Sequence, residues 1–332
     1  MKYVIGTDQG FTKTLTVISD LDGNILDAYK TGGAEHHCVG LDTQMKLIDE
    51  SFAEILRRSG VSKRGLAHIY CGLTGADWPE EYGQLRRLVQ ALGYCEEVSV
   101  VNDCQIAFKG GSLKSAGAVI CVGSGINCAV KSPAGEEFVY SFFAEDEIMG
   151  ATAIGTAALT LAYKSATGRI GSTALTQRLL DRFSARTVEE LLRLDVSGEI
   201  KNEDKRFLAP LVFECAKDGD EIAAGYIKDF GMKIAGLVNA RAKIYGMELT
   251  DFDVVLSGSV FKGPGSLLED AVRMEIHTVC PAARVVPARY EPVVGAVISA
   301  LEICAGGYDV ENIEASCKRL GLLRSSDFFF PE

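Results

Sequence analysis

The start of the chain alternates between short apolar runs and polar turns. Residues 3–7, 14–19 and 25–31 each form such a run, rich in β-branched and aromatic side chains. Runs of this length bounded by turn residues are typical of strands, and the Asp22-Gly23 turn joins the second run to the third. The pattern therefore predicts an antiparallel three-stranded meander.

After a polar loop that holds His36 and His37, the period of the apolar positions changes. In residues 43–58 they recur at helical spacing, which predicts an amphipathic helix. A buried strand is predicted at 67–71, a second amphipathic helix at 78–92, a strand at 98–101 and a short helix at 104–108. We expect these elements to complete one α/β unit.

The second half of the chain repeats this order. Strands are predicted at 118–122, 127–130 and 137–142, followed by a strand at 254–256, a helix at 266–276, a strand at 283–286 and a helix at 293–303. Residues 144–250 interrupt the repeat and are predicted to be mostly helical. Matching order in both halves indicates a duplicated βββαβαβ unit. We therefore expect two similar α/β domains, 1–112 and 113–312, that face each other across a cleft, with 313–332 packing back on the first.

Composition narrows the classes of function. The 332 residues carry 34 lysines and arginines against 45 aspartates and glutamates, a net charge of −11. This balance disfavours a nucleic-acid surface, because phosphate backbones bind to a basic patch. We expect no signal peptide at the start of the sequence, and no apolar run reaches the ~18 residues that a membrane span needs, so we expect a cytoplasmic protein. The ten cysteines form no CxxC pair, which indicates reduced core residues.

Two of the predicted turns carry groups suited to binding phosphate. The first follows the acid Asp8 and offers Gly10, Thr12 and Lys13, and the second is Gly123-Ser124-Gly125. Backbone N–H groups, hydroxyls and a lysine at a turn are phosphate-binding groups. Two such turns predict a nucleotide held between two related halves. Each glycine is also explained by a turn that needs positive φ.

Further polar residues follow the predicted strands, namely Asn102, Asp103, Asn127, Gly258-Ser259-Val260-Phe261 and the segment 214–220. Together with the two turns, this ordered set resembles the BadF/BadG/BcrA/BcrD ATPase family, and within it the N-acetylglucosamine kinases. These belong to the actin-like ATPase and sugar-kinase superfamily. The resemblance covers nearly the whole chain. It implies duplicated ribonuclease H-like domains with mixed five-stranded sheets, and ATP and Mg²⁺ as cofactors.

The resemblance also implies a role for each group. Asp8 would bind Mg²⁺, and the first turn would hold the β- and γ-phosphates. Asp103 would accept the proton of the attacking sugar hydroxyl. The nucleotide contacts implied are Gly10, Thr12, Lys13, Gly123, Ser124, Gly125, Ala216, Gly258 and Ser259. The acceptor contacts implied are Glu35, His36, Thr74, Asn102, Asn127, Glu145 and Glu147.

Several positions depart from the family pattern or have a purely structural explanation. Asp103 is also explained as the N-cap of the helix that follows it, and the two histidines as a solvated loop pair. Residues 145–152 replace the Gly-Asp-Glu-Gly-Ser segment that helps to hold the sugar in related kinases. The three phenylalanines at 328–330 are expected to form a packing or interface patch.

The sequence thus favours an ATP-dependent kinase that phosphorylates a hydroxyl of a sugar or amino sugar. Its expected partner is that small molecule, with a homodimer left open. An alternative is an ATPase that drives a partner protein, as the family's activators of 2-hydroxyacyl-CoA dehydratases do with an iron–sulfur cluster on paired cysteines. A second alternative is a nucleotide- or sugar-binding protein that has lost catalysis.

Overall fold

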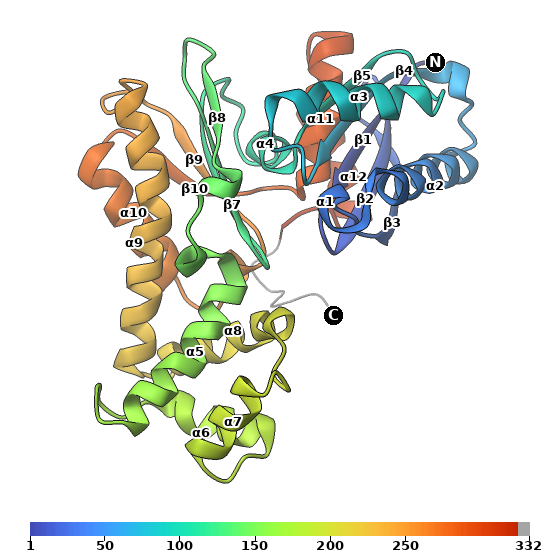
Figure 1. The fold of residues 1–332 in the computed structure, drawn as a ribbon. Helices are drawn as coiled ribbons and strands as arrows, with labels where there is room; N and C mark the ends of the chain where they lie inside the picture. The colour runs from blue at the N-terminus through green and yellow to red at the C-terminus, as the bar shows by residue number, and fades with distance from the viewer. Residues whose placement is uncertain (325–332) are drawn as a thin grey trace. The chain divides into compact units, whose positions relative to one another are not determined.

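The computed structural model describes residues 1–324, which form two compact units (Figure 1). Unit 1 consists of Met1–Val119 and Val286–Arg324, and unit 2 of Ile120–Val285. The Phe328–Phe330 run, expected as a packing or interface patch, lies outside the described residues. Within residues 1–324, no helix combines the length and apolar character that a membrane crossing requires.

Unit 1 is built on a five-stranded mixed sheet in the order β3-β2-β1-β4-β5. The β1–β2 and β2–β3 pairs are antiparallel, which confirms the predicted meander, whereas β4 and β5 extend the sheet in parallel. The strands are β1 (Tyr3–Gln9), β2 (Lys13–Asp20), β3 (Ile25–Gly32), β4 (Leu66–Leu73) and β5 (Val98–Asn102).

Helices cover both faces of this sheet (Figure 1). Because successive side chains of a strand point to opposite faces, Val4 and Ile5 of β1 belong to two different cores. On one face Ile5 packs with the apolar sides of α2 and α3, and on the other Val4 packs with α11 and α12. The elements are α1 (His36–Val39), α2 (Leu41–Ser59), η1 (Lys63–Gly65), α3 (Pro79–Ala91), α4 (Asp103–Lys109), α11 (Pro292–Ala305) and α12 (Val310–Leu320).

The helix α11 lies close to β1, although the sequence placed it with the second half. Gly6 makes this approach possible, because a Cβ at Gly6 would lie 2.7 Å from Val297 Cγ2 and 2.9 Å from the carbonyl oxygen of Val293. The chain therefore returns to unit 1 at Val286. This return follows from β-branched residues of α11 matching the apolar face of a sheet formed almost 300 residues earlier in the chain.

Unit 2 repeats the sheet, in the order β10-β9-β6-β7-β8. Reading each unit's strands in chain order, both sheets have the order 3-2-1-4-5, which confirms the predicted duplication. The strands are β6 (Gly117–Val122), β7 (Ile126–Lys131), β8 (Glu137–Val139), β9 (Asp253–Ser257) and β10 (Arg284–Pro287).

The prediction of a strand over 137–142 was wrong beyond Val139. Tyr140 donates its N–H to Cys128 at 2.8 Å, and the chain then turns into a 3₁₀ helix, η2 (Ser141–Phe143). Ser141 has φ of 43° and its N–H bonds to the side chain of Asn127 instead of a neighbouring strand. A non-glycine residue in this left-handed region cannot continue a strand.

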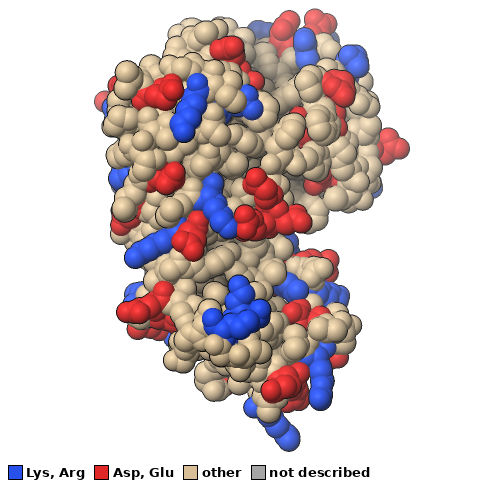
Figure 2. Space-filling model, turned by 60° about the vertical axis from the view of Figure 1, so that its left-hand side comes forward, with Lys and Arg blue, Asp and Glu red and all other residues tan. Residues whose placement is uncertain are grey.

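The predicted helical insertion is confirmed. It begins at η3 (Asp146–Ile148) and α5 (Gly150–Ala166), and its long helix α9 packs against α10. The other elements of unit 2 are α6 (Ala174–Phe183), α7 (Val188–Val196), η4 (Asn202–Leu208), α8 (Ala209–Lys217), α9 (Glu221–Ile244), η5 (Val260–Lys262) and α10 (Leu267–Val279). On the face shown in Figure 2, acidic and basic side chains are interspersed in small groups.

Candidate active site

The turn between β1 and β2 is a tight hairpin. The Gly10 N–H donates to the carbonyl of Lys13 at 2.9 Å, and the Gln9 amide donates to the Thr14 hydroxyl at 3.2 Å. These bonds close the turn and leave Thr12 exposed at its tip. The predicted phosphate-binding groups therefore lie on a turn that these hydrogen bonds hold in place.

Asp8 is on β1 just before this turn, and only 8% of its surface is exposed. Burial raises the pKa of its carboxyl to about 6, although the nearby positive charge of Lys13 acts in the opposite direction. Lys13 in turn lies 3.3 Å from the carboxylate of Glu291, which occupies the N-cap position of α11. A partly desolvated carboxylate of this kind gains stability from a nearby cation.

Asp103 is the first residue of α4, directly after β5. Asn102, not Asp103, is the N-cap: its side-chain oxygen accepts the N–H of Cys104 at 3.0 Å, and Gln105 completes the capping box. The capping explanation offered for Asp103 is therefore wrong. The N-cap of α4 therefore does not depend on the Asp103 carboxyl.

The surroundings of Asp103 favour its protonated form. Burial, followed by the negative charges of Asp8 and Asp77, raises the pKa of Asp103 to about 7. The charge of Glu35 acts in the same direction. Asp8, Glu35 and Asp103, which the sequence proposed from separate loops, thus lie close enough in unit 1 to interact electrostatically.

Asn102 and Thr74 position backbone in this region. The Asn102 amide donates to the carbonyl of Ala76 at 3.1 Å and to the Asp77 carboxylate at 3.0 Å. Thr74 donates its N–H to the carbonyl of Gln9 at 2.8 Å, which joins the end of β4 to the end of β1. Both predicted acceptor residues therefore also hold the loop between β4 and α3 in place.

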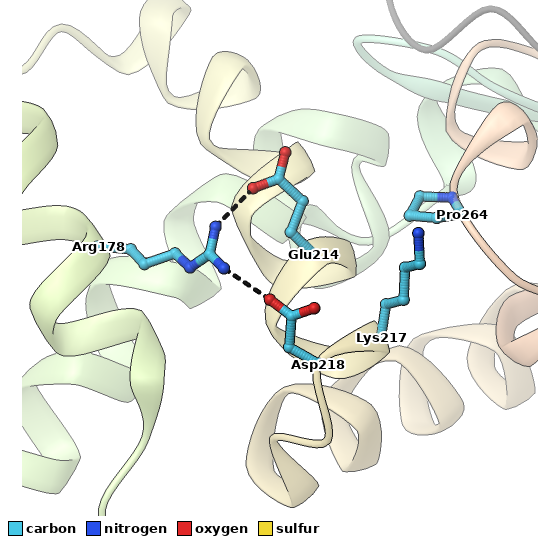
Figure 3. Close-up of a pocket in the computed structure, with 5 residues that line it drawn as sticks. All are labelled: Arg178, Glu214, Lys217, Asp218 and Pro264. Carbon is cyan, nitrogen blue, oxygen red and sulfur yellow. Dashed lines mark hydrogen bonds and ion pairs between the residues drawn. The ribbon is translucent and has the colours of Figure 1, made fainter.

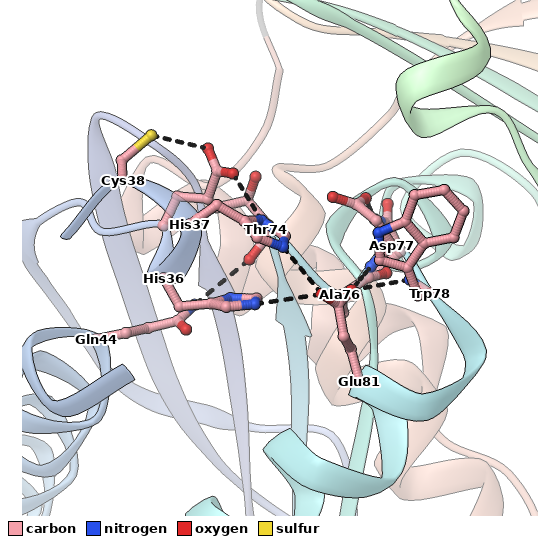
Figure 4. A network of polar contacts seen from close by, with 11 residues as sticks. His36, His37, Cys38, Gln44, Thr74, Ala76, Asp77, Trp78 and Glu81 are labelled. Atoms are coloured by element: carbon pink, nitrogen blue, oxygen red, sulfur yellow. Dashed lines mark hydrogen bonds and ion pairs between the residues drawn. The ribbon is translucent and has the colours of Figure 1, made fainter. Parts of the chain in front are cut away.

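The expected polar loop at His36 and His37 is instead a short helix, α1, preceded by Glu35 at its N-cap position. It packs beside the start of α3 (Figure 4). His37 lies between two carboxylates, 3.1 Å from Glu35 and 2.9 Å from Glu81, so the description as a solvated pair is wrong. Glu81 was not singled out in the sequence, because it reads as an ordinary acid in the first turn of a helix.

In unit 2, the Gly123-Ser124-Gly125 turn rests on the start of α5. The Gly123 N–H donates to the Gly125 carbonyl at 2.9 Å, and Ala151 and Thr152 donate their N–H groups to the carbonyls of Gly123 and Ser124. The end of the altered segment 145–152 therefore supports the turn directly.

Of the remaining predicted acceptor residues of unit 2, Asn127 and Glu147 make structural contacts. Asn127 uses its side-chain oxygen to accept the N–H of Ser141 at 2.9 Å. Glu145 is the N-cap residue of η3, and Glu147 forms an exposed ion pair with Lys233 at 2.7 Å. These residues lie together around η2 and η3.

A pocket of about 360 Å³ lies beside α8 in unit 2 (Figure 3). Arg178 of α6 closes one side by bonding to Glu214 at 2.9 Å and to Asp218 at 2.6 Å. Lys217 and Pro264 complete the lining. Ala216, predicted to contact the nucleotide, precedes Lys217 on the same helix.

The backbone of the loop after β9 packs closely against the end of β6. Gly258 has φ of 105°, and a Cβ there would lie 2.0 Å from the carbonyl oxygen of Val122. Only glycine fits this approach of two strand ends, and Ser259 is then the N-cap residue of η5.

Comparison with known proteins gives the family. The profile of the BadF/BadG/BcrA/BcrD ATPase family matches residues 5–300, which span both units. The chain belongs to the BadF/BadG/BcrA/BcrD ATPase family. The resemblance stated from the sequence is confirmed.

Named relatives cover nearly all of this family member. A protein of Clostridium acetobutylicum named N-acetylmuramic acid/N-acetylglucosamine kinase is 26% identical over 307 residues, 92% of this chain and 100% of that protein. A Dictyostelium discoideum protein named N-acetyl-D-glucosamine kinase is 27% identical over 312 residues, 90% of this chain and 97% of that protein.

A solved structure shares the fold. The ROK family glucokinase of Streptomyces griseus, in complex with glucose and AMPPNP, aligns with a TM-score of 0.60 at 17% identity, over 92% of this chain and 100% of that one. The expected duplicated α/β fold of the sugar kinases is therefore confirmed.

Sequence reasoning missed two glycines that shape the turns of this ATPase-family chain. A Cβ at Gly33 would lie 2.4–2.5 Å from backbone atoms of Gly10, Phe11 and Lys13, so Gly33 sits directly against the first turn. A Cβ at Gly150, which has φ of 51°, would lie 2.2 Å from the Gly125 carbonyl oxygen. Neither position carries a signal in one sequence, since the contacts come from distant segments.

Proposed function

We propose that this chain is an ATP-dependent kinase that transfers a phosphoryl group to a hydroxyl of a sugar or amino sugar. The observation that carries the proposal is Asp103, a carboxyl at a strand end that is free of the capping role and whose pKa is raised to about 7. A general base works best when its pKa is near the operating pH. The names of the two relatives support an amino sugar as acceptor.

The transfer assigns a task to each group. Ionised Asp103 accepts the proton of the acceptor hydroxyl as its oxygen attacks the γ-phosphorus of ATP, and ADP leaves with the electrons of the broken P–O bond. Thr12, Lys13 and the backbone N–H groups of the two glycine turns would bind phosphate oxygens. Glu35, His36, Thr74 and the acids around η3 are the proposed acceptor contacts.

Asp8 fits a magnesium site. Its buried carboxylate carries the type of oxygen ligand that Mg²⁺ prefers, and its raised pKa shows that its negative charge lacks full compensation. Magnesium bound through Asp8 and its waters would neutralise charge on the phosphates.

The test is a coupled assay for ADP with MgATP and a panel of N-acetylglucosamine, N-acetylmuramic acid, glucosamine and glucose. We expect at least a tenfold rise in ADP release with one sugar, and a sugar phosphate identified by mass spectrometry. No ADP release above the sugar-free rate with any hexose or amino sugar, despite ATP binding by calorimetry, contradicts the proposal.

The second candidate, an ATPase that drives a partner protein, is distinguished in the same preparation. It requires ATP hydrolysis without a sugar, together with iron and a visible absorption band from a cluster. The ten cysteines are free: six are buried, three are partly exposed, and Cys38 is fully exposed. We therefore base the proposal on the kinase.

A further inference from the structure

Three side chains from two segments of unit 1 converge on one point. His36 and His37 come from α1 and Glu81 from the first turn of α3, and one possible ligand atom of each lies within 4.8 Å of those of the other two. Figure 4 shows the two imidazoles facing the Glu81 carboxylate. Among residues 1–324, this is the one group of three His, Cys, Asp or Glu side chains whose possible ligand atoms lie this close together.

Glu81 is held in position by its other oxygen. Oε2 accepts the backbone N–H groups of Asp77 at 2.9 Å and Trp78 at 2.8 Å. Oε1 is thereby directed at the histidines, 2.9 Å from His37 Nε2 and 3.4 Å from His36 Nε2. In a tetrahedral zinc site with bonds of 2.0–2.1 Å, ligand atoms lie about 3.3 Å apart. Both separations are close to that value.

The proton arrangement of His37 also suits a metal. Its Nδ1 lies 3.1 Å from Glu35 Oε1, and a carboxylate can only accept, so Nδ1 carries the proton. Its Nε2 lies 2.9 Å from Glu81 Oε1, so a cation that displaced the Nε2 proton would lie between these two groups. A carboxylate that orients a ligating histidine through its other nitrogen is a frequent feature of zinc sites.

The site is enclosed on one side and accessible on the other. Side-chain exposure is 10% for His36 and 11% for Glu81, but 34% for His37. The backbone of Gly75 closes the buried side, since a Cβ there would lie 2.7 Å from His36 Nδ1. Water could complete a fourth position from the exposed side.

We propose that His36, His37 and Glu81 form a binding site for Zn²⁺, which fastens α1 to the start of α3. Two imidazoles and one carboxylate suit zinc better than Mg²⁺, which prefers oxygen ligands. The site is separate from Asp8. The competing explanation is that a protonated His37 bridges Glu35 and Glu81 without any metal.

The test uses the full chain, treated with EDTA and exchanged into metal-free buffer. Zinc is titrated by calorimetry, and Co²⁺ serves as a spectroscopic probe because its visible bands report tetrahedral coordination. We expect one zinc per chain and a rise in Tm on zinc addition. Glu81→Gln and His37→Gln should each lower zinc affinity at least tenfold, and Glu35→Gln by about 10- to 100-fold through His37.

Two controls separate this site from others. Glu80→Gln makes the same charge change one residue away, at an exposed position, and should bind zinc like the parent chain. Asp8→Asn should also retain zinc. Circular dichroism of the metal-free variants checks that they fold. Equal zinc affinity in Glu81→Gln and Glu80→Gln, loss of zinc only in Asp8→Asn, or no zinc binding overturns the proposal and leaves the protonated His37 bridge.

One consequence rests on the proposed function. Glu35 and His36 belong to the proposed acceptor contacts, so zinc should change the KM for the sugar more than the KM for ATP. A chain that binds zinc at this site but phosphorylates no sugar would refute the kinase and keep the zinc site. A kinase that binds no zinc would do the reverse.

Discussion

Replacing Asp103 by Asn separates catalysis from stability in a single variant. The change keeps the size of the side chain and leaves the N-cap, Asn102, untouched. It removes a half-buried carboxyl whose pKa is about 7, against an ordinary value of 3.8. We expect the variant to lose turnover and, at neutral and alkaline pH, to gain stability.

The sign and size of this stability change follow from proton linkage. Because the folded-state pKa of Asp103 exceeds the unfolded value, its contribution to stability is present below pH 4 and is lost as the pH rises to about 7. At about 1.4 kcal/mol per pKa unit, the full loss is at most about 4 kcal/mol. The Tm advantage of Asp103→Asn should therefore be small at pH 4–5, grow toward pH 7 and then level off, at about 2–4 °C per kcal/mol.

The kinetic expectation is opposite in direction. Turnover of the parent chain should fall as the pH drops below about 7, because the base becomes protonated. The apparent pKa of this pH profile belongs jointly to Asp8 and Asp103, since the two carboxyls interact. In Asp103→Asn, kcat should fall by about 10²- to 10⁴-fold while MgATP binding persists. Asp42→Asn, which changes an exposed acid in the first turn of α2, is the matched control and should alter neither property.

Thermal melts at four pH values and kcat against pH decide the matter. A Tm advantage that does not change with pH would show that the carboxyl is not desolvated in the way the structure indicates. Near-parental turnover in Asp103→Asn would place the base elsewhere, with Glu145, Asp146 and Glu147 the next residues to test.

Three further predictions use the same assays. Asp8→Asn should raise the KM for MgATP as well as lower kcat, which a Mg²⁺ titration at fixed ATP would reveal; an unchanged Mg²⁺ dependence would exclude Asp8 from the metal site. Gly33→Ala should reduce ATP affinity and Tm together, because the added methyl would lie 2.4–2.5 Å from backbone atoms of the first turn, and ATP titration calorimetry would show it. On α9, Gly231→Ala should lower Tm, since the added Cβ would lie 2.8 Å from Ala271 Cβ. Gly236→Ala, whose added Cβ would meet nothing within 4 Å, should stabilise the protein by about 0.5–1 kcal/mol. Equal Tm shifts in the two variants would refute the close packing at Gly231.

Periodicity was sufficient to predict the duplicated fold, because each strand and helix carries its own local pattern. The repeated succession of strands and helices along the chain and the helical insertion were predicted correctly on that basis, whereas the order of the strands within each sheet came only from the structure. The end of β8 was not, because Ser141 leaves the strand conformation through a bond to Asn127, fourteen positions earlier. The packing of α11 on β1 depends on Gly6, whose role appears only once the two segments are adjacent.

For the candidate site, the sequence located side chains but not their partners. Asp8 and Asp103 were singled out because each follows or ends a buried strand. Glu291 and Glu81 were missed because both read as ordinary acids at the start of a helix. Such pairings depend on backbone geometry between segments far apart in the chain, which no local pattern encodes.

Two acids of unit 1, Asp8 and Asp103, lower the stability of the fold when they are ionised. Asp8 and Asp103 have pKa values raised to about 6 and about 7, so the surroundings of each carboxyl disfavour its ionised form. Packing alone would favour neutral side chains here, and one Asn at position 102 already meets the capping requirement. A carboxyl whose charged form is unfavourable, at a position that is not needed as a helix N-cap, indicates a group retained for chemistry, and a cation or an acceptor proton would compensate each carboxylate. The same reasoning distinguishes Asp220, whose carboxylate accepts the N–H groups of Ile222 and Ala223 and so has a structural task.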